Sequence, residues 1–508
     1  MDFILALTPI LLIFFLMVGL RWGAARAGGA GYIATLMIAI SFFGTGPELL
    51  AFAHAKALLL SVDVLLIIWA AFLLYRVVDE AGAIRTIGQA LPHLTGDSGM
   101  QALIIGWVFA SFLQGVGGFG VPVAVVAPIL VGLGFTPLAA VVIPSIGHGW
   151  AVTFGSLGSS FQALMAATGL PGPTLAPPSA VFLGISGLVV GLMVAHAAGG
   201  WGSVRRLFWP VLFLGVVMGL VQFLVAVSGL WNIGSFTGAV AGLLIAFPIA
   251  GRFRGEPRDN GKLDLRALGV ALSGYAILVA IILAVQLIPS VKDFLGQVVI
   301  KVNFPEVRTA RGFVTRAEAG RTIVLFRHTG TVLVYAASLA YLIYRRAGLY
   351  QPRAIWRILG GTMRRVMSSS VSIVSMVAMA VIMEHAGMTD RLARGLAEGM
   401  GQIFPLVAPW IGALGAFMTG SNTNSNVVFG ALQLNTAQLL GFSAPLILAG
   451  QTAGAALASV IAPTKVVVGA STAGMAGREG EVMRKLLGYT GLTVLLVSVM
   501  TLVGISLG

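Results

Sequence analysis

Apolar segments long enough to cross a lipid bilayer follow one another along almost the whole chain. The hydrocarbon core of a bilayer is ~30 Å thick and takes about 20 helical residues. Of the 508 residues, 58% are hydrophobic and only 9% are charged, whereas soluble domains carry about 25% charged residues. We therefore expect an all-α polytopic membrane protein. Its roughly twelve candidate spans are residues 3–20, 31–50, 58–78, 138–165, 179–198, 207–228, 233–250, 267–288, 322–344, 366–386, 445–470 and 486–507.

Basic residues gather in the short loops between these segments. Because cytoplasmic loops carry an excess of Lys and Arg, the loops at Arg21, Arg76 and Arg205 and the stretches 252–266 and 345–365 should be cytoplasmic. The net charge of +14 therefore reflects membrane topology and does not indicate a nucleic-acid partner. The chain has no cysteine, which excludes disulfides and cysteine-based metal sites. We expect no cofactor and no bound metal.

Two glycine-rich or polar stretches, 112–122 and 418–426, interrupt short apolar arms. The arms are too short to cross a membrane, so residues 103–134 and 406–440 should each form a re-entrant hairpin. Backbone that is not helical is tolerated at membrane depth only where it faces protein or a watery cavity. Paired interruptions in two halves of a chain are a sequence pointer to the binding site of a transporter.

The order of elements predicts an inverted-topology repeat. The loop count makes the first hairpin enter from the cytoplasm and the second from outside. Each hairpin precedes a span broken by glycine or proline near its middle. The first half is residues 1–288, with hairpin 103–134 and broken span 138–165; the second half is residues 331–508, with hairpin 406–440 and broken span 445–470.

Residues 289–330 form a polar, basic segment between the halves. The loop count places this segment outside the cell. Two interpretations remain open. It could be a partly ordered surface loop, or a basic vestibule that concentrates anions.

The first hairpin turn contains Gly115-x-Gly117-x-x-Gly120, which matches the dinucleotide fingerprint. That motif needs a preceding strand and an acidic residue about 20 positions on. Neither is present here, so we reject it. Glycines permit positive φ and leave the backbone bare, so amides could point at a ligand; tight helix packing is the alternative. The candidate substrate-binding residues here are Gln114, Gly117, Gly118, Phe119 and Gly120.

The second turn carries six consecutive polar side chains at the expected membrane depth. Burying them unpaired in hydrocarbon would cost several kcal/mol. They should face one another, water or a ligand, unless the stretch is an external loop. The helices that follow the turns, expected to start at Val121 and Val427, would direct positive dipole ends at an anion. The candidates here are Ser421, Asn422, Thr423, Asn424, Ser425 and Asn426.

The two broken spans add ionisable and hydroxyl candidates. Lys465 lies inside the second one, where it could hold a carboxylate; a snorkelling lysine is the alternative. His148 lies inside the first and could carry a proton, or could be a neutral histidine with satisfied hydrogen bonds. Asp63 and the pair Glu384-His385 are read as interfacial. The remaining substrate-binding candidates are Ser156, Ser159, Ser160 and Thr464, and the candidates for ion coupling are His148, Asn422 and Lys465.

Several motifs resemble the bacterial L-lactate permease family. They are SFLQGVGGFGVPVA at 111–124, LVGLGFTPL at 130–138, GAFMTGSNTNSN at 415–426 and FGALQ at 429–433. The family usually has Glu at the position of Gln114, Asp at that of Asn422 and a small polar residue at that of Lys465. This chain therefore has two candidate carboxylates neutralised and one cation added, so its site should be more positive than is usual in the family.

The resemblance implies an inner-membrane transporter that imports lactate, glycolate and related 2-hydroxy monocarboxylates, generally with protons. It also implies an elevator motion and a homodimer. From the residues themselves we expect a secondary transporter of small organic anions, embedded in lipid. A cation/proton antiporter that uses sodium is a second hypothesis. A membrane-embedded enzyme or receptor is a third, and no catalytic motif in the sequence favours it.

Overall fold

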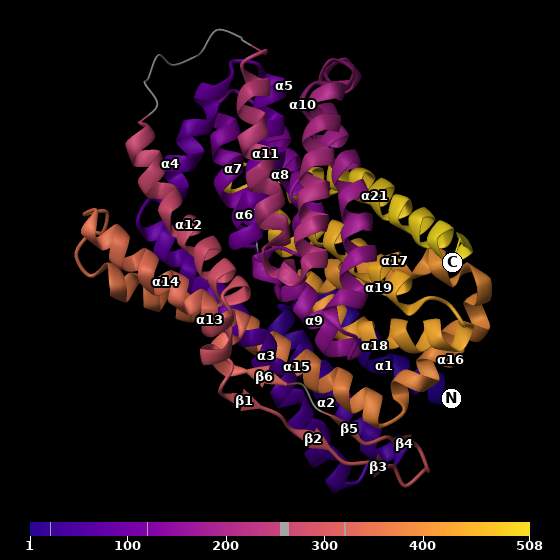
Figure 1. Cartoon of the computed structure of the whole chain (residues 1–508). Helices are drawn as coiled ribbons and strands as arrows, with labels where there is room; N and C mark the ends of the chain where they lie inside the picture. The colour runs from indigo at the N-terminus through magenta and orange to yellow at the C-terminus, as the bar shows by residue number, and fades with distance from the viewer. Residues whose placement is uncertain (21, 119, 254–263, 320–321, 508) are drawn as a thin grey trace.

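The computed structural model describes residues 1–20, 22–118, 120–253, 264–319 and 322–507. It is almost entirely helical (Figure 1). Eleven helical stretches in this part of the chain are long and apolar enough to cross a membrane. The first half contains α1 (Asp2–Phe14), α2 (Ala24–Phe43), α3 (Pro47–Glu80), α4 (Ala83–Ala90), α5 (Ser98–Gln101), α6 (Ala110–Val116), α7 (Val121–Gly132), α8 (Pro137–Gly147), α9 (Ser159–Thr168), α10 (Gly172–Val225), α11 (Gly234–Ala250) and α12 (Leu265–Leu287), and α13 (Pro289–Leu295) opens the segment between the halves.

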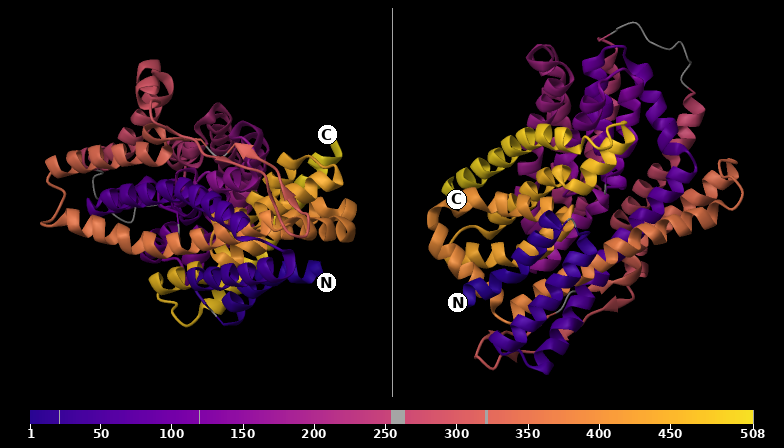
Figure 2. Two further views of the ribbon diagram at one scale, coloured as in Figure 1. Left: turned by 90° about the horizontal axis from the view of Figure 1, so that it is seen from below. Right: turned by 180° about the vertical axis from the view of Figure 1, so that it is seen from behind.

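The second half follows a β ribbon. Its helices are α14 (Thr329–Arg346), α15 (Ala354–His385), α16 (Met388–Met400), α17 (Phe404–Thr419), α18 (Asn422–Leu440), α19 (Ala444–Ala458), α20 (Pro463–Thr472) and α21 (Glu479–Leu507). Both termini lie at the same side of the molecule in every view (Figures 1 and 2).

Several expected spans differ in their bounds from the helices observed. The expected span 31–50 crosses the break between α2, which ends at Phe43, and α3, which begins at Pro47. The expected spans 179–198 and 207–228 lie on either side of an interruption of α10 at Gly199 and Gly200, and the second continues past Val225 into the π-helical segment Ala226–Leu230. Gly200 has φ +65°, a conformation that glycine adopts without strain. The expected span 322–344 begins too early, because α14 starts only at Thr329.

The first hairpin is a pair of helical arms whose turn includes Gly117, Gly118 and Gly120. Its first arm is longer than we expected. It runs over Ser98–Val116 and includes the π-helical segment Ala102–Phe109. Asp97 extends it, because its carboxylate accepts a hydrogen bond from the amide of Met100 (2.8 Å) and caps the helix. By length and composition this arm could cross a membrane, so our argument from a short arm fails here.

The second hairpin joins α17 and α18 through a turn at Gly420, which has φ +70°. After each hairpin comes a helix that is broken and then resumes. In the first half, α8 and α9 are separated by residues 148–158, where Ser156, Leu157 and Gly158 all have positive φ. In the second half, α19 and α20 are separated by a 3-10 turn at Ser459–Ile461. The same order of elements thus occurs in both halves.

Residues 289–330 are not an irregular loop in the described part. After α13, strands pair antiparallel as a long ribbon: β1 (Val299–Ile300) with β6 (Ile323–Val324), β2 (Asn303–Phe304) with β5 (Glu318–Ala319), and β3 (Val307–Arg308) with β4 (Val314–Thr315). The ribbon runs across the ends of α2, α3 and α15 (Figures 1 and 2). The amide of Ala310 in its tip donates to the carbonyl of Gly44 (2.8 Å), which ties the ribbon to the end of α2.

Candidate functional site

Both hairpin turns and the start of α20 meet at one cavity of about 460 Å³. Five of the residues predicted from sequence line it: Gly120, Ser421, Asn424, Thr464 and Lys465. These residues come from both halves of the chain. The remaining walls come from α3, α15 and the start of α2.

Close helix packing brings the two halves together at this cavity. Gly469 of α20 lies against Val123 of α7 and Val141 of α8, and a Cβ on Gly469 would lie only 2.7 and 2.8 Å from their side chains. Gly420 is equally close to α20, since a Cβ there would be 3.0 Å from the hydroxyl of Thr464. Small residues therefore hold the first hairpin, α20 and the second turn in contact.

The cavity is suited to an anion. Three helices begin at its wall: α7 after Gly120, α18 after Ser421, and α20 at Pro463. The N-terminus of a helix presents free amide groups and a positive dipole end. Lys465 adds a cation, with Nζ donating to the Ser459 hydroxyl at 3.0 Å. None of the described residues lining this cavity is acidic.

Arg364 and Arg365 of α15 add two more cations to the wall, and sequence reasoning missed them. We had placed both in a cytoplasmic loop that ends at residue 365. In the structure α15 begins at Ala354 and carries them to the cavity. Arg365 also lies over the ring of Phe72, 5.6 Å from its centroid. The sequence signal that could have identified the two arginines is their position at the junction of a basic loop and an apolar span.

The six polar residues of the second turn are not an extended loop. Ser421 is the N-cap, and its hydroxyl accepts a hydrogen bond from the amide of Asn424 (3.3 Å). Residues 422–426 are already helical, so α18 starts at Asn422 and our predicted start at Val427 was wrong. The physical reason is that serine caps a helix well, so the polar residues begin the helix instead of delaying it.

A buried hydrogen-bond network links this turn to both broken spans. Asn422 Nδ2 donates to Thr153 Oγ1 (3.1 Å), and Asn426 Nδ2 donates to Thr452 Oγ1 (2.9 Å). The two threonine hydroxyls are 3.2 Å apart. Thr153 and Thr452 were missed from sequence, because single threonines in apolar runs carry no distinctive signal.

The other predicted residues on α18 and α9 differ in their hydrogen-bond partners. Asn426 Nδ2 also donates to the Ser160 carbonyl (3.0 Å), and the Ser160 and Thr423 hydroxyls are 3.0 Å apart. These residues therefore belong to the same network. Ser425 instead donates to the carbonyl of Gly412 in α17 (2.8 Å), so it joins the arms of the hairpin. The hydroxyl of Ser159 is buried without a hydrogen-bond partner.

Three amide oxygens on the first turns of α18 have no hydrogen-bond partner. They are the Oδ1 atoms of Asn422, Asn424 and Asn426, and all three are buried. A buried acceptor without a partner costs about 1–3 kcal/mol. An array of such acceptors beside a cavity is a place where a ligand, an ion or water would be stabilised.

The first turn packs behind the cavity. Gly118 has φ +56° and faces Ser156 so closely that a Cβ would overlap the serine hydroxyl. Gln114 lies beside the same glycine, and its Oε1 is buried without a partner. A Cβ on Gly117 would meet Tyr75 of α3 at 3.2 Å. Phe119, another predicted site residue, lies outside the described residues.

His148 is fully buried between α8 and the break that follows it. Its Nδ1 lies 2.6 Å from the carbonyl of Pro144, so Nδ1 must carry the proton. Nε2 is then the available acceptor, and it is buried without a hydrogen-bond partner. Lys465 is near enough to interact with the imidazole electrostatically, but His148 is not among the residues that line the cavity.

Two residues read as interfacial are buried. Asp63 lies in the middle of α3 and is 2% exposed; it accepts hydrogen bonds from His328 Nε2 (3.0 Å) and Gln162 Nε2 (2.9 Å). His385 is also 2% exposed. For Asp63 the prediction failed because α3 begins at Pro47, well before the start at residue 58 that we assigned, whereas α15 ends at His385, close to the end that we assigned. No group of three potential metal ligands of the His, Cys, Asp or Glu type occurs among the described residues.

An all-helical chain with this many apolar helices, and with interrupted helices around a cationic cavity, belongs to the class of multi-pass membrane proteins. The profile of the L-lactate permease family matches residues 2–508. The chain therefore belongs to the L-lactate permease family. It is a membrane transporter of small organic anions and not an enzyme, and it resides in the bacterial inner membrane.

Characterised relatives match over nearly their whole length. The glycolate permease GlcA of Escherichia coli K12 is 25% identical over 98% of this chain and 95% of its own. The L-lactate permease of Bacillus subtilis 168 is 27% identical, over 98% of this chain and 94% of its own. Among solved structures, the Alcanivorax borkumensis YdaH transporter superposes with a TM-score of 0.51 at 13% identity, covering 91% of this chain and 88% of that one. This last likeness concerns the fold alone.

Proposed function

We propose that the protein carries small 2-hydroxy monocarboxylates, such as lactate or glycolate, and binds them in the cavity between the two hairpin turns. The observation that supports this most directly is the meeting of three helix N-termini with Lys465, Arg364 and Arg365 around one cavity. Several positive groups at one place stabilise a carboxylate that has lost its water. The names of the relatives, lactate and glycolate permeases, agree with that substrate class.

Different residues would bind different groups of the substrate. Lys465 and the amides that follow Ser421 would hold the carboxylate, because after Gly120 the amide of Val121 already donates to the carbonyl of Gly118 and Pro122 has no N–H. The unpartnered amide oxygen of Asn424 would accept a hydrogen bond from the 2-hydroxyl group of the acid. Asn422 would hold the turn in place through Thr153.

The architecture would allow alternating access. We propose that residues 103–134 and 406–440 are re-entrant hairpins of an inverted repeat, with halves 1–288 and 331–508 joined by an external segment 289–330. The hairpins and broken helices would move together past α3 and α15, as in an elevator. Half-helices that start at the middle of the membrane are the arrangement in which transporters bind anions.

Proton symport is the coupling we propose, with His148 as the proton carrier and Asn422 and Lys465 as the groups that respond to it. The Nε2 atom of His148 is a buried acceptor close to the cation of Lys465. A proton on His148 would be repelled by Lys465, and a bound carboxylate would relieve that repulsion. Proton and acid would therefore bind together.

Sodium coupling is the second candidate, and a separate observation favours it. The unpartnered Oδ1 atoms of Asn422, Asn424 and Asn426 lie on the first turns of α18, and the Nδ2 groups of Asn422 and Asn426 donate to the paired hydroxyls of Thr153 and Thr452. Oxygen atoms of this kind can coordinate a desolvated sodium ion. The residues would then serve an ion that accompanies the acid.

Uptake of labelled lactate and glycolate into proteoliposomes tests the proposal. We expect saturable uptake by the wild-type protein, and an increase of at least about tenfold in KM for Lys465→Ala, because one charge-assisted hydrogen bond is lost. Lys301→Ala removes an exposed cation from the ribbon and is the control, with unchanged kinetics. Unchanged saturable transport in both Lys465→Ala and Asn422→Ala would rule out this site.

The same vesicles distinguish the coupling ions. An inward proton gradient without sodium should drive lactate above equilibrium if protons are coupled, and His148→Gln should abolish that accumulation while retaining exchange of labelled for unlabelled lactate. Accumulation that needs an inward sodium gradient would contradict proton symport and support the sodium site at the three asparagines.

A further inference from the structure

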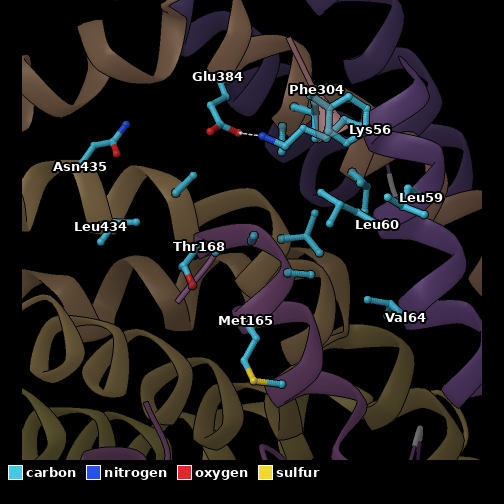
Figure 3. Close-up of a pocket in the computed structure, with 18 residues that line it drawn as sticks. Lys56, Leu59, Leu60, Val64, Met165, Thr168, Phe304, Glu384, Leu434 and Asn435 are labelled. Atoms are coloured by element: carbon cyan, nitrogen blue, oxygen red, sulfur yellow. Dashed lines mark ion pairs between the residues drawn. The ribbon is translucent and has the colours of Figure 1, made fainter. Parts of the chain in front are cut away.

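A second cavity, of about 220 Å³, lies between α3, α9, α15 and α18 (Figure 3). Lys56 and Glu384 face each other across one side of it, and Thr168 and Asn435 lie on the opposite side. The other described lining residues are almost all apolar. None of the residues that line this cavity lines the cavity at the hairpin turns.

The same helix faces line both cavities in succession. Residues three, four or eight positions apart lie on one face of a helix. On α15 the face passes from Arg365, Ser369 and Ile373 at the first cavity to Val377, Val381 and Glu384 at the second. On α3 it passes from Phe72 to Val64, Leu60 and Lys56, and on α18 from Asn424 to Val427, Ala431 and Asn435. The two cavities are therefore at opposite ends of one interface.

Each end of this interface carries positive charge. The exposed Arg364 and Arg365 and the half-buried Lys465 are at the first end, and Lys56, only 9% exposed, is at the second. Lysine is rarely buried in a membrane protein unless it is used. An anion that entered this interface from either end would therefore meet a cationic group.

The ion pair at the second cavity has a geometry in which another anion could replace Glu384 as the partner of Lys56. Lys56 Nζ and Glu384 Oε2 are 3.6 Å apart, which is longer than a hydrogen bond. This pair is one of the interactions that Lys56 makes. The Glu384 side chain is 36% exposed, so the carboxylate can turn to water when another anion takes its place.

The shape of the cavity limits the ligand. Pockets for drug-sized molecules measure about 300–1,000 Å³, and 220 Å³ is smaller. Lys56 offers one cationic group, Thr168 and Asn435 offer hydrogen bonds, and the apolar walls suit a short hydrocarbon body. The complementary ligand is a small monocarboxylate.

We propose that this cavity is a second binding site for the transported monocarboxylate, in which its carboxylate replaces Glu384 at Lys56. The inference rests on the proposed function and adds a site at the opposite end of the route. If the basic loops are cytoplasmic, this end is the outer one, and Lys56 is the first cation that an incoming acid meets. Glu384 competes with the acid for Lys56 and so favours its onward release.

Single cysteines test the site, because the chain has no native cysteine. Ala380→Cys places a thiol in the wall of the second cavity and Ser369→Cys places one in the wall of the first. Both variants would be labelled as full-length protein in membrane vesicles with a membrane-impermeant, uncharged methanethiosulfonate. Ala380→Cys would be labelled in right-side-out vesicles and Ser369→Cys in inside-out vesicles. The measured quantity is the L-lactate concentration that halves the labelling rate.

We expect L-lactate to protect both thiols. Adding Lys56→Gln should raise the half-protecting concentration at position 380 at least tenfold and leave it unchanged at position 369. Adding Glu384→Gln should lower it at position 380, because the competing carboxylate is gone. If the ion pair of Lys56 and Glu384 were purely structural, neither substitution would change the half-protecting concentration at position 380. Val377→Cys replaces Ala380→Cys if that variant does not fold.

Two results would overturn the inference. One is protection at position 369 without protection at position 380, which leaves the proposed function intact. The other is protection at position 380 that Lys56→Gln does not alter. Absence of protection at both positions would instead contradict the proposed function itself, and the second site with it.

Discussion

At the scale of single residues, an acidic group buried within a membrane helix of this protein is held by hydrogen-bond donors from other elements. Asp63 illustrates this. A carboxylate within a membrane helix is costly unless it is paired, and here it accepts hydrogen bonds from His328 and Gln162. His328 also accepts a hydrogen bond from the amide of Gly330 through Nδ1 (3.2 Å), so Nε2 carries the proton that reaches Asp63. These contacts join α3 to α9 and to the start of α14.

Asp63→Ala should destabilise the protein. It leaves the donors of His328 and Gln162 without a partner, and each such loss costs about 1–3 kcal/mol. We expect a lower melting temperature in detergent, with a smaller decrease for Asp63→Asn, which keeps one acceptor. The control is Glu306→Ala, which removes an exposed pair with Arg308 and should change stability by less than about 1 kcal/mol. Equal shifts for Asp63→Ala and the control would refute the role of this cluster.

Residue types alone predicted part of the site. Lys465 and the polar run that starts at Ser421 stood out because such groups are expensive in hydrocarbon, and the structure brings Lys465, Thr464, Ser421 and Asn424 to one cavity. Thr153 could not be found in this way. A single threonine satisfies its hydroxyl within a helix easily, so its presence in an apolar segment carries little information.

At the scale of elements, the two turns depend on glycines with left-handed backbone. Gly118, Gly120 and Gly420 all have positive φ, which other residues rarely adopt. These turns place the starts of α7 and α18 at the cavity wall. Sequence predicted the turns because glycine has this local property. It did not predict the start of α18, because capping by Ser421 competes with loop formation over the same residues.

Gly118→Ala should disrupt the first turn. The new Cβ would overlap the hydroxyl of Ser156, and alanine is strained at φ +56°. We expect lactate uptake to fall at least about tenfold, since a strain of ~1–2 kcal/mol at the turn displaces the start of α7. Gly132→Ala, at the other end of α7 and with open space around it, should leave uptake unchanged. Partial recovery in Gly118→Ala/Ser156→Ala would identify the overlap as the cause, whereas wild-type uptake in Gly118→Ala would contradict the prediction.

At the scale of the whole molecule, the elevator motion that we propose would require the second turn to move relative to α15. Asn424 Nδ2 of α18 now donates to Ser372 Oγ of α15 at 3.0 Å. A covalent link at this place would hold the two elements together. Because the chain has no cysteine, two introduced thiols would be the reactive pair.

Linking Asn424→Cys and Ser372→Cys with a short reducible bifunctional thiol reagent should stop net uptake, and reduction should restore it. Uptake by the same double-cysteine protein is compared before and after reduction of the link, so any effect of the substitutions themselves cancels. The single variant Ser372→Cys, treated with the same reagent, should retain its activity. Full transport by the linked protein would show that this contact persists throughout the cycle.

The sequence by itself determined the membrane class of the protein, its helical spans and the glycine turns, because bilayer thickness and backbone conformation act locally on each segment. Tertiary structure decided which segments meet. The contact between Thr153 and Thr452 joins residues 299 positions apart, and the arrival of Arg364 and Arg365 at the cavity depends on where α15 starts and how it packs. Such contacts follow from the fit of whole helix faces, which no local pattern encodes.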